Sequence, residues 1–301
     1  MNSSLISKPT LFSFRECLWF LDRNYDECLH KISNSRVTKA IQFNNKPLVF
    51  SLADKDQDIL IQIEEGHATP SMMEELRSWV QDWLDIQRDI RPFYQMLANH
   101  GKLNYMTKEF NGLRLIGIEN LHESICWCII GQQINLSFAY KLKRRLVEEF
   151  GTRVRTATGN FYLFPSPETL SSVSVETLKA LQFSRQKADY IIQISKSFSD
   201  GLISKEKLST LPDLKEKKYL LTSLKGVGEW TANYVLMKSL REPDCIPLGD
   251  IGLLNALSNH ALIKNRKDSR SMEKLFSAFE GWKSYLVFYL WRSLAIPNFH
   301  H

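Results

Sequence analysis

The stretch from Leu224 to Tyr234 constrains the fold of this chain more than any other segment. It reads Leu-Lys-Gly-Val-Gly-Glu-Trp-Thr-Ala-Asn-Tyr and joins two segments with helical patterning, residues 212–223 and 229–240. Two glycines this close together permit a tight turn, and the second helix then begins with unpaired backbone N–H groups. A phosphate can approach glycine backbone closely and is attracted by the positive end of the helix dipole. The predicted contacts to a nucleic-acid backbone are Gly226, Val227 and Gly228.

A glycine pair by itself also fits an ordinary turn between two helices, so the hairpin alone leaves that alternative open. A dinucleotide-binding turn is excluded, because that motif follows a strand and the residues before Gly226 are patterned as a helix.

A single aspartate opens the next apolar segment. Pro247-Leu248-Gly249-Asp250 precedes Ile251-Gly252-Leu253-Leu254, and an Asp at such a place is most simply a helix N-cap. However, a Leu-x-Gly-Val-Gly hairpin followed by a Gly/Pro-rich loop and one Asp resembles the signature of the helix-hairpin-helix superfamily of base-excision DNA glycosylases. Within that superfamily, the hairpin is most similar to the bacterial 3-methyladenine DNA glycosylase II group.

Two further segments carry this resemblance. Residues 129–135, Ile-Ile-Gly-Gln-Gln-Ile-Asn, are similar to the family's Ile-x-Gly-Gln-Gln segment between two helices. Residues 281–285, Gly-Trp-Lys-Ser-Tyr, are similar to its Trp-Arg-Ser-Tyr segment. The matching segments occur in the family's order and span Leu113 to Leu294. The strand-like N-terminal part also fits, since this group has a small antiparallel sheet domain there.

Excision of a base requires the target nucleotide to leave the stack, so such an enzyme needs a carboxylate facing the sugar and a pocket for the base. The resemblance implies that Asp250 stabilises the positive charge that develops as the glycosidic bond breaks, and orients or deprotonates water. Electron-rich rings would attract cationic alkylated purines. The implied pocket residues are Trp230, Tyr234 and Trp282. The other tryptophans, Trp19, Trp79, Trp83, Trp127 and Trp291, are assigned to the packed core.

The resemblance also implies contacts to the duplex. Gln133 stands where the family places the wedge that fills the gap left by the flipped base; a polar loop residue is the alternative. The backbone carbonyls implied to hold a monovalent or divalent cation at the hairpin, bridging it to phosphate, are those of Thr222, Leu224 and Val227. The basic run from Lys141 to Arg145 is interpreted as a solvated helix face, with contact to DNA phosphates as the lesser alternative.

Two groups of residues that some family members use are missing from this chain, and this limits the reactions that we expect. Family members that also cut the strand place a Schiff-base lysine two residues after the second hairpin glycine, and here that residue is Trp230. Relatives with an iron–sulfur cluster need four cysteines after the aspartate, and this chain has none after Cys245. No His/Cys grouping has zinc spacing. We therefore expect no strand cleavage and, apart from the hairpin cation, no required cofactor.

Composition agrees with an intracellular DNA-binding protein. The 301 residues include 39 Lys and Arg against 33 Asp and Glu, a net charge of +6, which favours a polyanionic partner. The five cysteines are scattered and odd in number, as in reduced proteins, and no signal peptide or membrane span is expected. We expect a monomer in the bacterial cytoplasm, associated with the nucleoid.

The patterning predicts an α+β fold with two domains, residues 1–112 and 113–301. The first contains a small antiparallel sheet and a linker helix over 72–86, which begins at a capping box of Ser71 and Glu74. Its predicted strands are residues 11–14, 17–21, 41–43, 48–52 and 59–63, with a helix within 27–38. The second is helical, with predicted helices at 120–130, 135–150, 166–170, 175–181, 184–198, 212–223, 229–240, 250–257 and 282–294.

These features together predict a monofunctional glycosylase that excises alkylated purines from damaged double-stranded DNA. Two alternatives remain. One keeps the fold but acts on oxidised guanine, against which the missing lysine counts. The other is a non-catalytic DNA-binding module, which would have no use for Asp250 or the aromatic residues.

Overall fold

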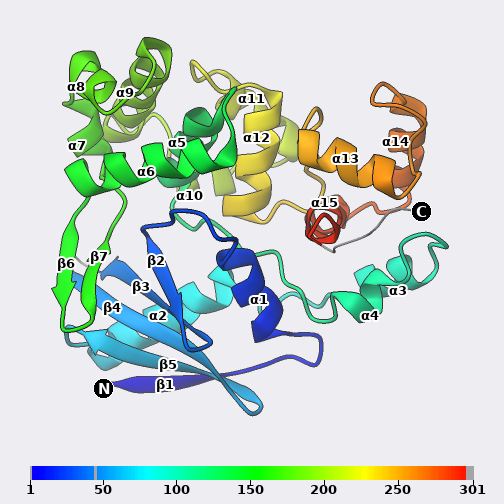
Figure 1. Cartoon of the computed structure of the whole chain (residues 1–301), viewed down its shortest axis with the longest axis horizontal. Coiled ribbons are helices and arrows are strands. Elements are labelled where there is room, and N and C mark those ends of the chain that lie inside the picture. The colour runs from blue at the N-terminus through cyan, green and yellow to red at the C-terminus, as the bar shows by residue number, and fades with distance from the viewer. Residues whose placement is uncertain (1, 44–45, 296–301) are drawn as a thin grey trace.

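The computed structural model, which describes residues 2–43 and 46–295, confirms the α+β fold (Figure 1). The N-terminal part contains a five-stranded antiparallel sheet in the order β1-β5-β4-β3-β2. Its strands are β1 (Ser3–Ser7), β2 (His30–Ser33), β3 (Arg36–Phe43), β4 (Lys46–Lys55) and β5 (Asp58–Glu65). The strands predicted at 41–43, 48–52 and 59–63 lie in β3, β4 and β5.

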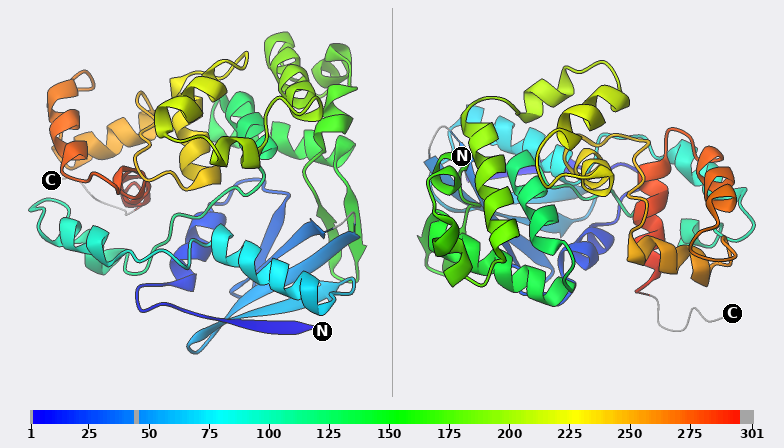
Figure 2. Two further views of the ribbon diagram at one scale, coloured as in Figure 1. Left: turned by 180° about the vertical axis from the view of Figure 1, so that it is seen from behind. Right: turned by 90° about the horizontal axis from the view of Figure 1, so that it is seen from above.

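The central strand β4 is buried on both faces. Residues 48–52 are all buried, although a one-sided strand would alternate between buried and exposed positions. On one face Phe50 packs edge-on against Trp79 of α2 (Pro70–Trp83), with ring centroids 5.8 Å apart. On the other face Val49 clusters with residues of a second, two-stranded sheet formed by β6 (Arg153–Thr156) and β7 (Gly159–Tyr162). The helical part thus reaches back over the sheet, as Figure 2 also shows.

Two N-terminal predictions are wrong. Residues 11–14 and 17–21 form no strands; instead α1 (Phe14–Leu21) begins at Ser13, whose side chain accepts the Glu16 N–H. The helix predicted within 27–38 is replaced by the β2–β3 hairpin. Asn34 and Ser35 connect those strands with φ angles of 50° and 55°, the left-handed pair that a tight hairpin turn requires.

The remaining helices of the N-terminal part are α2, α3 (Arg91–Ala98) and α4 (Met106–Glu109). The predicted capping box at Ser71 is also wrong. The N-cap of α2 is Thr69, which accepts the Met72 N–H, and Pro70 occupies the first turn, where no N–H donor is needed.

The helices predicted beyond residue 120 are confirmed, with ends shifted by one or two residues, except that the segment 229–240 divides into α12 and a π-helical turn over Leu236–Leu240. The helices are α5 (Leu121–Gly131), α6 (Leu136–Phe150), α7 (Pro167–Ser171), α8 (Val175–Ala180), α9 (Arg185–Ser199), α10 (Lys205–Ser209), α11 (Leu214–Thr222), α12 (Glu229–Val235), α13 (Ile251–Asn259), α14 (Ser269–Ser277) and α15 (Lys283–Ser293). The sequence did not predict α10, α14 or the β6–β7 hairpin.

One hydrophobic core runs through both parts of the molecule. The buried guanidinium of Arg114 contributes to this connection, because it donates to the backbone carbonyls of Leu11, Asp85 and Arg88. Among the described residues, no helix has the length and hydropathy needed to cross a membrane.

Candidate active site and DNA-facing surface

Asp250 is the N-cap of α13, and its Oδ1 atom accepts two hydrogen bonds. The backbone N–H of Leu253 donates to it at 2.7 Å, and the indole Nε1 of Trp291 donates at 2.9 Å. The preceding residue, Gly249, has φ +86°, a left-handed conformation that favours glycine. Both hydrogen bonds engage the same oxygen, so they orient the carboxylate while neither uses Oδ2.

Trp291 lies on α15, and the sequence assigns it to the core. The structure instead places its ring, half-buried, between the carboxylate of Asp250 and the ring of Tyr234, whose centroid is 6.1 Å away. The segment 284–290 of α15 is buried on every side, so the helix has no apolar stripe that would distinguish core residues from a residue facing a site. The sequence therefore carries no signal for the role of Trp291.

Trp230 and Tyr234 stand one turn apart on α12. Their rings stack with centroids 5.3 Å apart and planes at 16°, and both pack against the hydrophobic core. Burial raises the pKa of the Tyr234 hydroxyl, which therefore stays uncharged at neutral pH. With Trp291, these residues form a continuous aromatic cluster that ends at the carboxylate of Asp250.

Trp282 lies elsewhere. Among the described residues, its ring contacts are with Phe93 of α3, at a centroid distance of 5.9 Å, and with Tyr285, at 5.5 Å. It is the N-cap residue of α15, whereas Trp291 is near the end of that helix. The structure therefore brings Trp230 and Tyr234 together as the sequence predicts, but joins them to Trp291 and not to Trp282.

The hairpin between α11 and α12 gives its two glycines different roles. Gly226 has φ +89°, and a Cβ atom there would come within 2.4 Å of the Tyr190 ring. Gly228 is the N-cap of α12 and has an ordinary φ of −97°, and a Cβ atom there would meet no atom within 4 Å. Val227 between them is buried. Gly226 is thus required by packing, while Gly228 presents open backbone at a helix N-terminus, where an anion can approach.

The loop between α5 and α6 is tied to this hairpin. The side-chain amide of Gln132 donates to the carbonyl of Gly226 at 2.9 Å. Its neighbour Gln133 is exposed and has φ +57°, a left-handed conformation that is strained for a residue other than glycine. The predicted wedge residue therefore projects from a loop that the hairpin holds in place.

Exposed apolar side chains surround these loops. Leu136 in the first turn of α6 is 43% exposed, and Leu248 and Ile251 on either side of Asp250 are 59% and 65% exposed. These apolar side chains are therefore available to contact a molecule bound at either loop.

The predicted cation site has carbonyl oxygens that can serve as ligands. Thr222 ends α11, so its carbonyl lacks a donor within the helix. The carbonyl of Leu224 accepts the N–H of Val227, which leaves one of its two lone pairs for an ion. Carbonyl oxygens suit hard cations, so these residues and the Val227 carbonyl fit such an ion.

The interpretation of residues 141–145 as a solvated face is wrong for Lys143. This side chain is buried, and its ammonium lies 3.2 Å from Glu27 and 3.1 Å from Glu123. Burial opposes ionisation of Glu27, but the charges of Lys143 and His30 lower its pKa to about 2. This cluster ties α5 and α6 to the segment before β2.

The five cysteines are all buried as free thiols. Among the residues that the structure describes, no three His, Cys, Asp or Glu side chains are grouped as metal ligands.

Comparison with known proteins places this geometry in a family. Residues 126–280 match the model of the HhH-GPD superfamily of base excision DNA repair proteins, and residues 21–125 match the N-terminal domain of 8-oxoguanine DNA glycosylase. The chain is 32% identical to DNA-3-methyladenine glycosylase of Bacillus subtilis over 96% of both proteins. It is 25% identical to DNA-3-methyladenine glycosylase 2 of Escherichia coli over 196 residues, which are 64% of each protein.

A solved structure shares the whole architecture. The 3-methyladenine DNA-glycosylase from Archaeoglobus fulgidus superposes with a TM-score of 0.83 at 24% identity, covering 98% of this chain and 100% of that one. The family model spans the loop of Gln133, the hairpin and Asp250, all of which the structure places at the ends of neighbouring helices. The chain therefore belongs to the HhH-GPD superfamily of base excision DNA repair proteins.

Proposed function

We propose that this protein is a monofunctional DNA glycosylase that flips alkylated purines of the 3-methyladenine type out of damaged double-stranded DNA and hydrolyses their N-glycosidic bonds. The observation that carries the proposal is the carboxylate of Asp250, held by two N–H donors at the end of an aromatic cluster. The names of the Bacillus subtilis and Escherichia coli relatives support the same substrate class.

The geometry supports a dissociative reaction. As the bond between C1′ and the base nitrogen breaks, its electron pair leaves with the base and positive charge develops on the sugar. The oxygen Oδ2 of Asp250 would face that charge, because both N–H donors engage Oδ1. A fixed negative charge in this place stabilises the transition state without reorganisation. Water then adds to C1′ and loses a proton, which Asp250 can accept.

The aromatic cluster would select the base. Trp230, Tyr234 and Trp291 offer electron-rich faces next to the carboxylate. An alkylated purine that carries positive charge is attracted to such faces by about 0.5–2 kcal/mol per ring. A normal base lacks this attraction and also has a stronger glycosidic bond, so excision would favour damaged bases.

The DNA would be held by its backbone. Gly228 at the N-terminus of α12 would receive a phosphate, and Gln133 would fill the gap in the duplex. The carbonyls of Thr222, Leu224 and Val227 would hold a cation that adds positive charge beside that phosphate. The proposal includes no iron–sulfur cluster and no zinc. We further propose that the enzyme is a monomer in the bacterial cytoplasm.

A second candidate substrate, oxidised guanine, is favoured by the N-terminal match to 8-oxoguanine DNA glycosylase. The solved 8-oxoguanine glycosylase/lyase of Clostridium acetobutylicum has a similar fold, with a TM-score of 0.79, but at 16% identity it speaks for the fold alone. Trp230 at the position of the family's lysine counts against lyase chemistry of that kind.

One experiment tests the substrate class. The protein is incubated with methylated DNA and with duplexes that carry a single hypoxanthine, ethenoadenine, 8-oxoguanine or uracil, and the released bases are measured. Release of 3-methyladenine, with little 8-oxoguanine, is the expected result. Release of 8-oxoguanine alone would favour the second candidate, and binding without any release would favour a non-catalytic module.

A further inference from the structure

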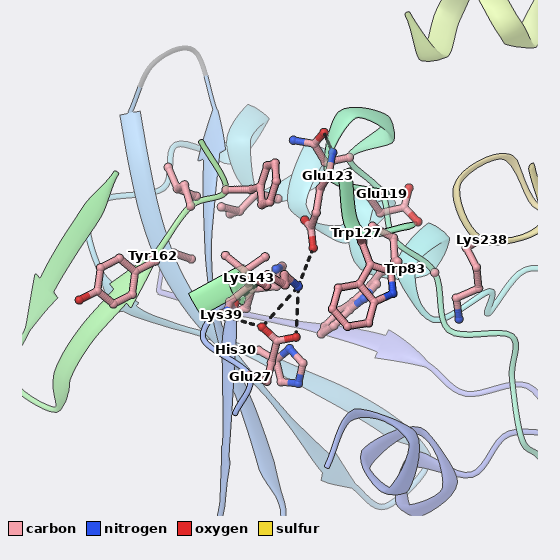
Figure 3. Close-up of a pocket in the computed structure, with 18 of the residues that line it drawn as sticks. Glu27, His30, Lys39, Trp83, Glu119, Glu123, Trp127, Lys143, Tyr162 and Lys238 are labelled. Carbon is pink, nitrogen blue, oxygen red and sulfur yellow. Dashed lines mark hydrogen bonds and ion pairs between the residues drawn. The ribbon is translucent and has the colours of Figure 1, made fainter. Parts of the chain in front are cut away.

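A large cavity lies between the N-terminal sheet and the helical part (Figure 3). Its volume is about 700 Å³, within the range of pockets that hold small molecules. Tyr234 lines this cavity, whereas Asp250, Trp230 and Trp291 do not. Tyr234 is therefore shared between the candidate active site and this second space.

The walls of the cavity offer flat aromatic surfaces. Trp127 of α5 packs against Tyr140 of α6, with ring centroids 4.7 Å apart. Trp79 and Trp83 of α2 contribute a second aromatic pair, 5.2 Å apart. Aromatic side chains that converge on one space from different elements favour a planar ligand that can stack.

Charged groups of both signs also line the cavity, and most carboxylates among them are already paired. Lys143 contacts Glu27 and Glu123, and Lys205 contacts Glu119 at 2.8 Å. The lining carboxylates are Glu27, Asp82, Glu119 and Glu123, and the lining cations are Arg23, Lys39, Lys143, Lys205 and Lys238. Five cations face four carboxylates, so the charges nearly balance and a neutral purine base can bind without adding a charge of its own to this space.

The ammonium group of Lys39 uses only part of its hydrogen-bonding capacity within the protein. It donates one long hydrogen bond, of 3.3 Å, to the carbonyl of Leu29. An ammonium carries three N–H donors, so two of those of Lys39 remain for a ligand in the cavity that it lines. A purine ring nitrogen would provide an acceptor for Lys39 while the ring stacks on Trp127.

We propose that this cavity is a second purine-binding site, which receives the excised base after the glycosidic bond has broken. The proposal rests on the proposed function, because that reaction supplies the base. Bound DNA would cover the outer side of the active site, and the Tyr234 ring, which borders both the active site and this inner space, would have to turn aside to let the base pass. The base can then leave the catalytic cluster while the abasic strand is still bound.

The test measures binding of free bases, so it does not depend on catalysis. Adenine and 3-methyladenine are titrated calorimetrically into the full-length protein saturated with a duplex that carries a tetrahydrofuran abasic-site analogue. Adenosine 5′-monophosphate is the nucleotide control. We expect both bases to bind and the nucleotide to bind more weakly; no binding of either base, or tighter binding of the nucleotide, would overturn the proposal.

Single substitutions in the cavity wall test where the free base binds. Trp127→Ala and Lys39→Met should each weaken binding of the base about fivefold to tenfold, as loss of one stacked ring or one hydrogen bond predicts. Lys39→Met keeps the test decisive if Trp127→Ala does not fold. Tyr219→Ala, at a side chain 78% exposed on α11, is the aromatic control and should not change the affinity.

The catalytic cluster provides the contrasting variant. Trp230→Ala should leave binding at the cavity intact, because Trp230 does not line it. Loss of base binding in Trp230→Ala, with wild-type affinity in Trp127→Ala and Lys39→Met, would mean that the base occupies only the catalytic cluster and would overturn the proposal. Release of bases from methylated DNA is measured separately on the same protein, so failure of the proposed function is distinguished from failure of this site.

Discussion

The indole Nε1 of Trp291 donates a hydrogen bond of 2.9 Å to Oδ1 of Asp250. The same oxygen accepts the backbone N–H of Leu253, so the last helix of the chain and the first turn of α13 jointly fix the carboxylate. The Trp291 ring also contacts Tyr234. One side chain thus connects the candidate catalytic charge with the aromatic cluster proposed to hold the base.

Replacement of Trp291 by Phe tests this connection. Phe keeps an aromatic ring but lacks the N–H donor, and a hydrogen bond to a charged group contributes about 1.5–3 kcal/mol. The single-turnover excision rate should therefore fall about tenfold to hundredfold while the variant still binds lesion DNA. Trp282→Phe is the matched comparison and should stay within about twofold of the wild type, because its ring packs against Phe93. A large loss of excision rate in Trp282→Phe alone would indicate that Trp282, and not Trp291, belongs to the base pocket.

The two hairpin glycines should respond differently to the same substitution. Gly226→Ala should lower the free energy of unfolding by about 1–3 kcal/mol, because of its φ of +89° and the nearby Tyr190 ring. Gly228→Ala should fold normally, since a Cβ there meets open space, but should weaken DNA binding by crowding the phosphate. Gly101→Ala, also in open space, is the control. Unchanged DNA affinity in a folded Gly228→Asp variant would contradict the hairpin assignment.

The product should be an intact strand with an abasic site. Trp230 replaces the lysine that would form a Schiff base, and the ammonium of the nearby Lys225 is 3.0 Å from the carboxylate of Asp189. Borohydride added during turnover should therefore trap no covalent protein–DNA complex. If a trapped complex appears, Lys225→Met shows whether that lysine is responsible.

The features that were predicted correctly from the sequence are encoded in short segments. The hairpin glycines and the N-cap at Asp250 are encoded within a few residues, and the structure places them at the helix ends as expected. The helix predicted from residue 135 is α6, and Asn135 is its N-cap. Local signals of this kind need no knowledge of which elements pack together.

The errors depend on packing between distant segments. Residues 17–21 of α1 are a continuous apolar run, too short for its pattern to distinguish a helix from a strand, and the turn of the β2–β3 hairpin contains no glycine. Lys143 belongs to a basic run but finds Glu27, 116 residues away. Trp291 and Trp282 are both aromatic residues of one apolar segment, and their different surroundings are set by α13 and α3, which the spacing along α15 does not reveal.

The stability of the fold should depend on His122 at mildly acidic pH. This residue is 2% exposed, and its Nε2 atom is 2.8 Å from the Ser195 hydroxyl, which itself donates to the carbonyl of Ile191. Burial lowers the pKa of His122 to about 4. In the unfolded chain its pKa is close to 6.5, so the folded state binds the proton less tightly.

The resulting stabilisation is complete above about pH 6.5 and is lost as the pH falls toward 4. Between pH 7 and 4 the wild type should lose about 3 kcal/mol more of its free energy of unfolding than His122→Phe, which cannot titrate. Urea unfolding at a series of pH values measures this difference. Parallel pH profiles for the two proteins would show that His122 is not buried as a neutral ring.

The most direct test of the catalytic role is Asp250→Asn, assayed by single-turnover release of 3-methyladenine from methylated duplex DNA. Asn caps a helix about as well as Asp, so thermal stability and DNA binding should match the wild type. The negative charge is lost, and we predict that excision falls by at least about 10²-fold. A stable Asp250→Asn variant with near-normal excision would contradict the mechanism at its centre, because the carboxylate would then be no more than a helix cap.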